Sequence, residues 1–204
     1  PSIVLMENAA RAVADVCEKE LKDINNPKVL IFAGKGNNGG DGFALARILN
    51  DRNIECKLAF LFENSKFSED ARINYKAAIN SGLYIITDIT EAVIETMRAD
   101  IVVDAVFGTG ISREITGIYA DVINVINTYS KKVISVDIPS GVNSDNGQIM
   151  GCAVNADITV TFALPKIGML LYPGGEHCGR IEIANISIQQ STIDSIDIKT
   201  GFLD

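Results

Sequence analysis

Short apolar segments alternate with longer amphipathic segments along the first two thirds of this chain. Apolar residues recur at helical spacing from Met6 to Ile24, which predicts an opening helix that ends at Asn25-Asn26-Pro27. Strands are predicted at residues 29–33, 54–60, 83–87, 101–103 and 133–136. Helices are predicted from about 41 to 49, from a capping Ser68 to a stop before Gly82, from 90 to 98 and from 118 to 129. This alternation predicts a parallel sheet with helices on both faces.

The last third of the chain has a different pattern. Residues 158–162 and 180–183 are predicted strands, but the connection between them is short and rich in glycine and proline. This favours extra strands at one edge of the same sheet over a second domain. Residues 191–204 have no strong pattern, so we expect a domain of residues 1–190 followed by a tail or a linker to a further domain. The predicted class is α/β: a three-layer αβα Rossmann-like sandwich, its sheet mostly parallel with extra C-terminal strands.

Three loops rich in glycine and polar residues follow three of the predicted strands. They are residues 34–42 (Gly-Lys-Gly-Asn-Asn-Gly-Gly-Asp-Gly), 104–110 (Asp-Ala-Val-Phe-Gly-Thr-Gly) and 137–141 (Asp-Ile-Pro-Ser-Gly). Loops that leave the carboxyl ends of parallel strands open onto one edge of the sheet, where ligands bind. The three loops are therefore expected to converge on one site, and the chain is expected to be an enzyme.

Composition narrows the class of partner. At 204 residues the chain suits one large domain, and its formal net charge of −8 argues against nucleic acid, because phosphate backbones need a basic surface. No apolar run approaches the roughly 18 residues that span a bilayer, so no membrane segment is expected. With four cysteines outside CxxC spacing and a single histidine, His177, a zinc site is disfavoured. Buried thiols in a reducing, cytoplasmic setting are expected instead, and His177 is expected on a surface loop.

The first loop has the spacing of a dinucleotide fingerprint but not its electrostatics. Gly34, Gly36 and Gly39 satisfy GxGxxG between a strand and a helix. Asp41, however, would lie in or beside the first turn of that helix, where a carboxylate repels a phosphate. The acidic residue expected at the end of the second strand is also poorly placed, with Glu63 as the nearest candidate. An ordinary NAD-dependent dehydrogenase is therefore disfavoured.

A purely structural explanation of the first loop is one alternative. Its glycines and asparagines tolerate positive φ, so the loop is expected to make a tight turn, with Asp41 as a helix cap. A turn alone would not need to share a sheet edge with two more acidic loops. Asn37 and Asn38 instead favour polar contacts to a sugar or base, or oxygen ligation of a cation.

Five motifs, taken in order, resemble the YjeF N-terminal domain family, which comprises the NAD(P)H-hydrate epimerases. They are Leu5-Met6-Glu7-Asn8-Ala9, the three loops above, and residues 161–168 (Thr-Phe-Ala-Leu-Pro-Lys-Ile-Gly). The resemblance runs from about residue 2 to residue 188. The family usually has proline where Lys35 stands and glycine where Ala10 stands. Of these two departures, only Lys35 is expected to alter entry to the site.

The resemblance implies a set of residues that bind a hydrated dinucleotide, NADHX or NADPHX. They are Asn37, Asn38, Gly39, Gly40, Asp41, Gly108, Thr109, Gly110, Ile111, Ser112, Arg113, Glu114, Asp137 and Lys166. It also implies a potassium ion held by Asn38, Asp104 and Ser140, which offer amide, carboxylate and hydroxyl oxygens. A homodimer and, in many bacteria, a fused ADP- or ATP-dependent dehydratase domain are further implications.

The implied chemistry inverts one carbon centre. The C6 hydroxyl of the hydrate sits next to the ring nitrogen, whose lone pair can expel it once an acid protonates it, and water can return to the other face. Asp137 is the expected acid and base, and Lys166 is a weaker candidate for steering phosphate or stabilising charge. Asp104, Asp137 and Ser140 have an alternative role as caps or turn residues. The alternative function is a non-catalytic dinucleotide-binding or scaffold module, although buried acids argue against it.

Overall fold

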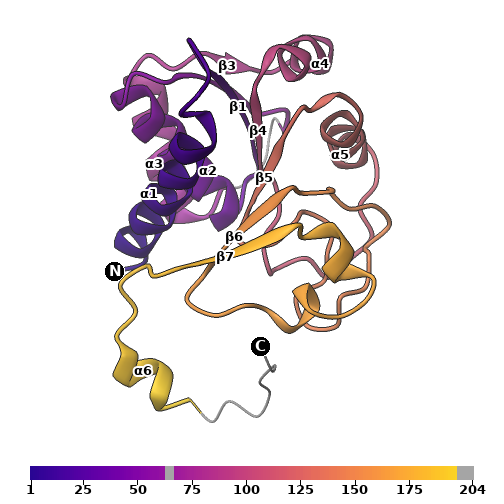
Figure 1. Ribbon diagram of the computed structural model, residues 1–204. Helices are drawn as coiled ribbons and strands as arrows, with labels where there is room; N and C mark the ends of the chain where they lie inside the picture. The colour runs from indigo at the N-terminus through magenta and orange to yellow at the C-terminus, as the bar shows by residue number, and fades with distance from the viewer. Residues whose placement is uncertain (63–66, 197–204) are drawn as a thin grey trace.

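Seven parallel strands form the middle layer of the part of the chain that the structure describes, residues 1–62 and 67–196. In this computed structural model the strand order is β3-β2-β1-β4-β5-β6-β7 (Figure 1). The strands are β1 (Lys28–Ala33), β2 (Glu55–Ala59), β3 (Ile85–Ile86), β4 (Ile101–Ala105), β5 (Val133–Val136), β6 (Ile158–Phe162) and β7 (Arg180–Ala184). The predicted parallel sheet is confirmed, and β6 and β7 are the extra strands added in parallel at one edge.

Helices cover both faces of this sheet (Figure 1). One face carries α1 (Ser2–Leu21), α2 (Asn37–Asp51) and α3 (Glu69–Asn80), and the other carries α4 (Ile89–Arg98) and α5 (Ile118–Tyr129). Shorter elements follow β6 and β7: the 3-10 helices η1 (Ile167–Met169) and η2 (Gly174–His177), and α6 (Gln190–Asp194). The three-layer αβα sandwich predicted from the sequence is therefore confirmed.

The strand order reverses between β1 and β4, and this reversal positions the site. The helix that follows β1 lies on one face and the helix that follows β4 lies on the other, so their connecting loops separate. Ligands bind in the crevice that opens at such a switch point. The register places Phe32 beside Asp104, and Asp104 beside Ser135, so the strands that carry the loops end level with one another.

Burial explains why the central strands are uninterrupted apolar runs. Five of the six residues of β1 are apolar and almost inaccessible, as are Val102 and Val103 of β4. A parallel sheet covered on both faces favours such runs over an alternating pattern. Asp104 follows them as a fully buried acid, which makes it the exception that needs a functional or structural reason.

Several local predictions need correction. α2 begins at Asn37, four residues before the predicted start. Ser68 occupies the N-cap position of α3, but its hydroxyl is buried and makes no cap hydrogen bond. His177 ends a 3-10 helix and is half-buried, with Nδ1 3.2 Å from Val154 O, so it is not on a surface loop. The predicted tail begins with α6, and residues 197–204 lie outside the described residues.

The burial of most cysteines agrees with the expectation from composition. All four thiols, Cys17, Cys56, Cys152 and Cys178, are free, and all except Cys152 are buried. Burial raises the pKa of the Cys17 thiol to about 12 and that of Cys178 to about 11, so neither is a reactive thiolate. Within the described ranges, no helix has the length and apolar character that crossing a bilayer requires.

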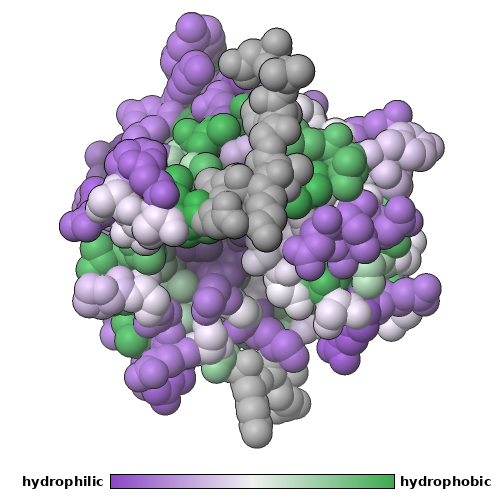
Figure 2. All heavy atoms as spheres, turned by 90° about the horizontal axis from the view of Figure 1, so that it is seen from below, coloured by the Kyte–Doolittle hydropathy of each residue, from purple (hydrophilic) through white to green (hydrophobic). Residues whose placement is uncertain are grey.

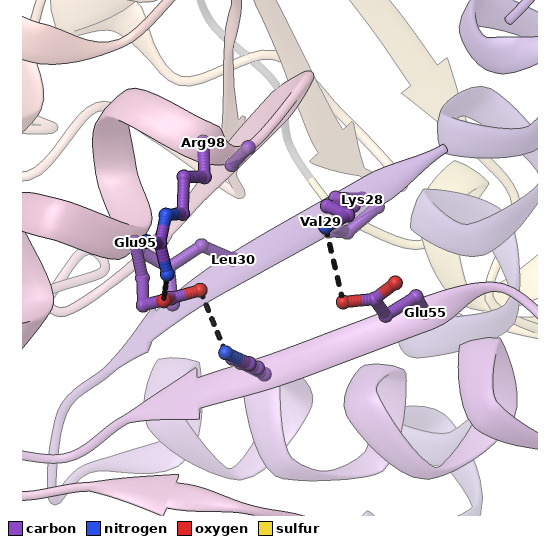
Figure 3. A pocket seen from close by; sticks show the side chains of 8 residues that line it. Lys28, Val29, Leu30, Glu55, Glu95 and Arg98 are labelled. Carbon is purple, nitrogen blue, oxygen red and sulfur yellow. Dashed lines mark hydrogen bonds and ion pairs between the residues drawn. The ribbon is translucent and has the colours of Figure 1, made fainter. Parts of the chain in front are cut away.

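The amino-terminal edge of the sheet, opposite the loops, carries a small crevice that ion pairs fill (Figure 3). Glu95 Oε2 lies 2.7 Å from Lys57 Nζ and Glu95 Oε1 lies 2.8 Å from Arg98 Nη1. Lys28 and Glu55 form a longer pair at 3.7 Å. The cavity volume of about 10 Å³ holds roughly one water molecule. This crevice is therefore a structural ion-pair cluster with no room for an organic ligand.

Candidate active site

The glycine loop between β1 and α2 is shaped by backbone packed against backbone. A Cβ atom on Gly34 would stand 2.0 Å from Val106 O, and one on Gly39 would stand 1.8 Å from Gly34 O. Neither position can hold a side chain unless the main chain moves. At Gly36, by contrast, nothing lies within 4 Å. None of residues 34–42 has a positive φ, so the prediction that positive φ explains these glycines is wrong; close approach explains them.

A cleft of about 380 Å³ opens between this loop and the loop that follows β4. Its lining comes from all three predicted loops: Lys35, Gly36, Asn37, Asn38, Asp41, Val106, Phe107, Gly108, Thr109, Gly110, Ile111 and Asp137. Figure 2 looks onto this carboxyl edge of the sheet, where the surface is hollowed near its centre and hydrophilic residues lie in the hollow. The volume falls in the range of small-molecule sites. The predicted convergence of the loops is confirmed.

Asp137, the first residue after β5, carries a carboxylate that is held in a fixed direction. Its backbone φ of 69° is in the left-handed region, which non-glycine residues seldom adopt and which clusters at functional sites. Lys166 Nζ forms a short ion pair with Asp137 Oδ1 and donates a hydrogen bond to Thr161 Oγ1 at 2.8 Å. The side chains of Lys166 and Asp137 are 19% and 16% exposed. The pair is therefore largely shielded from water, yet Asp137 still reaches the cleft.

Asp41 is a second carboxyl group in the cleft, in different surroundings. Because α2 begins at Asn37, Asp41 lies directly after its first turn, which agrees with the predicted place in or beside that turn, but Gly36 and not Asp41 occupies the N-cap position. Its side chain makes no hydrogen bond or ion pair with any residue that the structure describes, and the residue is 9% exposed. Burial, and next the nearby charge of Asp137, raises the pKa of the Asp41 carboxyl well above its ordinary value. Asp41 therefore favours the neutral form, which carries a proton.

Asp104 is the buried centre of a hydrogen-bond network beneath the cleft. Its Oδ1 accepts from Ser140 Oγ at 2.5 Å and Val106 N at 3.3 Å. Its Oδ2 accepts from Ser140 N at 2.8 Å and Ser135 Oγ at 2.9 Å. Burial raises the pKa of Asp104, and the bonds from Ser140 and Ser135 oppose that rise. Asp104 thus ties β4 to β5 and to the loop after β5.

Asn38 and Ser140 meet at the main chain of Phe107. Asn38 Nδ2 donates to Phe107 O at 2.9 Å, and Phe107 N donates to Ser140 Oγ at 2.8 Å. Asn38 Oδ1 is buried without a hydrogen-bond partner among the described residues, which costs free energy unless something else satisfies it. A cation would satisfy this oxygen and balance the buried Asp104. The oxygens gathered here are of the hard type that alkali and alkaline-earth cations prefer.

The structure brings most of the predicted binding residues to the cleft wall. Eight of them line it: Asn37, Asn38, Asp41, Gly108, Thr109, Gly110, Ile111 and Asp137. Two more belong to the first turn of α2 and are buried behind the cleft wall: Gly39 and Gly40. Three are exposed and do not line this cleft: Ser112, Arg113 and Glu114. Lys166 contacts the cleft through its pair with Asp137, and Glu63 lies outside the described residues.

Two site residues escaped the analysis of the sequence. Ser135 of β5 donates to Asp104, and Thr161 of β6 lies between Lys166 and Asp137. Both are polar residues within mostly apolar strands, and both are fully buried. A buried polar residue needs a partner, so the break in the apolar pattern was the signal that could have found them.

These features define the class of the protein: a Rossmann-like α/β protein with a polar cleft at the topological switch point of its sheet. A sequence profile of the family described as YjeF-related protein N-terminus matches residues 2–168. The chain therefore belongs to that family.

Relatives and one solved structure support this assignment. The bifunctional NAD(P)H-hydrate repair enzyme Nnr of Moorella thermoacetica is 41% identical over 199 residues, and the match covers 95% of this chain but 38% of that enzyme. The NAD(P)H-hydrate epimerase of Oenococcus oeni is 42% identical over 192 residues, covering 93% of this chain and 88% of the relative. The crystal structure of yeast ynu0 superposes with a TM-score of 0.73 at 21% identity, covering 88% of this chain and 76% of that chain. The likeness to ynu0 supports the fold.

Proposed function

We propose that this protein is an NAD(P)H-hydrate epimerase, an isomerase that interconverts the R and S epimers at C6 of hydrated NADH or NADPH. The observation that carries the proposal is the ion-paired Asp137 at the wall of a polar cleft. Support comes from the family, since the similar protein of Oenococcus oeni, named as an epimerase, matches nearly the whole of this chain.

The substrate needs little from the protein beyond proton transfer and positioning. The hydroxyl at C6 and the ring nitrogen form a hemiaminal, so protonation of the hydroxyl lets the nitrogen lone pair expel water. Water then adds to the opposite face of the iminium carbon and loses a proton, which inverts the centre. No electrons leave the substrate, so the step needs only an acid and a base.

Asp137 is suited to move this proton, because its carboxylate faces the cleft and is fixed by Lys166 and Thr161. Asp41 supplies a second carboxyl group in the same cleft, and its raised pKa favours the form that carries a proton. Two carboxyl groups whose surroundings differ in this way suit the separate roles of a proton donor and a proton acceptor.

A potassium ion is part of this proposal. Asn38 Oδ1, which lacks a partner, together with Phe107 O, Ser140 Oγ and the charge of Asp104, would hold it. When bound, the cation supplies positive charge near an anionic dinucleotide. The residues beneath the cleft would meanwhile keep the loops after β1, β4 and β5 in register through their hydrogen bonds.

The experiment follows both C6 epimers of NADHX and NADPHX by chromatography, with and without the protein, in potassium buffer. We expect interconversion well above the spontaneous rate. Asp137→Asn should lower the rate by about 10²–10⁴-fold, because it removes the proton-transfer group and keeps its shape. Asp51→Asn is the matched control, since Asp51 is an exposed acid at the far end of α2. Wild-type protein without acceleration, or an Asp137→Asn variant with full turnover, contradicts the proposal.

A homodimer, and a fused ADP- or ATP-dependent dehydratase domain, stay predictions from the family. The chain spans 38% of the length of the bifunctional Moorella relative and 88% of the Oenococcus relative, so similar proteins differ widely in total length.

A further inference from the structure

Lys35 is the basic residue among those that line the cleft in the described part of the chain. It lies between Gly34 and Gly36 at the mouth of the glycine loop, and its side chain is half-buried. Its ammonium group forms no ion pair or hydrogen bond with the described residues. A cation that lines a cleft and has no partner there is available to an anionic ligand.

The backbone around Lys35 is fixed even though its side chain is unpaired. Gly34 N donates to Ala105 O at 2.9 Å, and Ser68 N donates to Lys35 O at 3.2 Å. The peptide is thus held from the side of β4 and from the start of α3. A side chain on such an anchored peptide loses less freedom on binding than one on a mobile loop.

The other charged groups of the cleft do not compete for Lys35. Asp137 is already paired with Lys166, and burial favours the neutral form of Asp41. Lys166, which the sequence suggested for steering phosphate, donates to Asp137, Thr161 and the main chain of Phe162, so Lys35 is the less engaged of the two lysines.

A dinucleotide carries at least two negative phosphate charges, and the chain has a net charge of −8. The mean field of such a protein repels the substrate, so a local cation at the entrance has a large influence on its binding. Lys35 also directly precedes the N-terminus of α2, a helix of 15 residues with no acid in its first turn. The positive end of the helix dipole adds to the charge of Lys35 at this place.

We propose that Lys35 binds a phosphate group of the hydrated dinucleotide and thereby sets the affinity for substrate. The inference rests on the proposed function, because the substrate class comes from it. The phosphate belongs either to the pyrophosphate bridge, which NADHX and NADPHX share, or to the 2′-phosphate, which only NADPHX has. The reacting carbon C6 is in the nicotinamide ring, and neither candidate phosphate is part of that ring. A contact between Lys35 and a phosphate therefore affects substrate binding and not the chemical step.

The test compares KM and kcat of wild type, Lys35→Ala and Lys35→Arg for both hydrates. Lys76→Ala is the matched control, because Lys76 is an exposed lysine of α3 that lies outside the cleft and its loss changes the net charge equally. Lys35→Ala should raise KM roughly tenfold with kcat nearly unchanged, and Lys35→Arg should retain most of the affinity. If the KM of Lys35→Ala rises for both hydrates, Lys35 contacts the pyrophosphate. If the KM rises for NADPHX alone, Lys35 contacts the 2′-phosphate.

Calorimetric titration of the same variants with the two hydrates separates this inference from the proposed function. If the wild type binds the hydrates but does not epimerise them, a weaker Kd for Lys35→Ala still supports the phosphate contact. An unchanged KM and Kd, or a change no larger than that of Lys76→Ala, overturns it. Loss of kcat at constant KM also overturns it, and wild-type protein that binds neither hydrate overturns both proposals.

Discussion

The ammonium group of Lys166 is paired with the carboxylate of Asp137, although the two residues are 29 positions apart in the chain. The pair joins the loop after β5 to the segment after β6. Because β5 and β6 are neighbours in the sheet, the pair forms at the shared carboxyl edge. The contact makes Lys166 a candidate for positioning Asp137, the expected catalytic acid, and its role toward substrate stays a prediction.

We expect Lys166→Ala to reduce kcat for epimerisation by about 10–100-fold, because an untethered carboxylate spends less time in the reactive direction. Lys166→Arg should recover part of the loss, since it restores a cation near Asp137. The thermal transition of each variant, measured by circular dichroism, separates misplacement from unfolding. Full activity in Lys166→Ala would show that Asp137 does not need this partner.

Asp41 should limit the stability of the fold, because a buried carboxyl group without a partner resists ionisation. Its raised pKa stabilises the folded state below the ordinary value of 3.8, and that contribution is lost as the pH rises toward and through the raised pKa. Asp41→Asn should therefore raise the free energy of unfolding by about 1–2 kcal/mol at neutral pH, and the gain should grow with pH above 4. Urea titrations at several pH values measure it; a gain that is constant with pH would contradict this explanation.

Glu20 of α1 should make the protein sensitive to acid. Hydrogen bonds from Lys132 and Arg180 lower the pKa of the Glu20 carboxyl from 4.5 to about 2. A lowered pKa stabilises the folded state above 4.5, and that stability is lost as the pH falls through about 2. Glu20→Gln should therefore cost about 1 kcal/mol at neutral pH, since both partner cations are more than a third exposed and water screens the pairs.

The difference in free energy of unfolding between wild type and Glu20→Gln should shrink as the pH falls from 4.5 through about 2, because protonation removes the negative charge of Glu20. Glu18→Gln is a suitable control: Glu18 is an acid on the same helix whose side chain is 60% exposed. A Glu20→Gln deficit that persists undiminished at the acid end would mean that packing, and not charge, explains it.

Gly39→Ala should destabilise the protein by more than about 3 kcal/mol or prevent folding, because its Cβ would stand 1.8 Å from Gly34 O. Gly36→Ala in the same loop should cost at most about 1 kcal/mol, since nothing lies within 4 Å of its Cβ and its φ of −88° suits any residue. Unfolding in guanidinium chloride measures both variants. Equal losses at the two positions would mean that loop flexibility, and not close approach, sets the requirement for glycine.

Much of the fold was predictable because its elements have strong periodic patterns. Residues 133–136 and 158–162 are mostly apolar stretches bounded by polar loops, and β5 and β6 have these bounds. The start of α2 was misplaced by four residues, since Asn37, Asn38 and two glycines are weak helix formers whose conformation depends on packing against the loop after β4.

The candidate site was predictable in its loops but not in its pairings. Parallel topology alone brings Asp41, Asp104 and Asp137 to one edge. It does not reveal that Asp104 is saturated by hydroxyl and amide donors while Asp41 has none, because the donors of Ser135 and Ser140 lie 31 to 36 positions from Asp104. The directions of Ser135 and Thr161 within their strands decide the hydrogen bonds, and only the three-dimensional structure specifies them.

Gly34 and Gly39 are required by the fold, because their backbones contact neighbouring backbone too closely for a side chain. This requirement is independent of the chemistry at the site. A homologue that lost catalytic activity during evolution would still need both glycines in order to fold, so it would keep the glycine motif. Asp41, Asp137 and Lys166 are under no such steric demand and would be free to drift. Among homologous sequences, these three side chains would therefore distinguish active enzymes from inactive homologues better than the glycine motif by which the family is recognised.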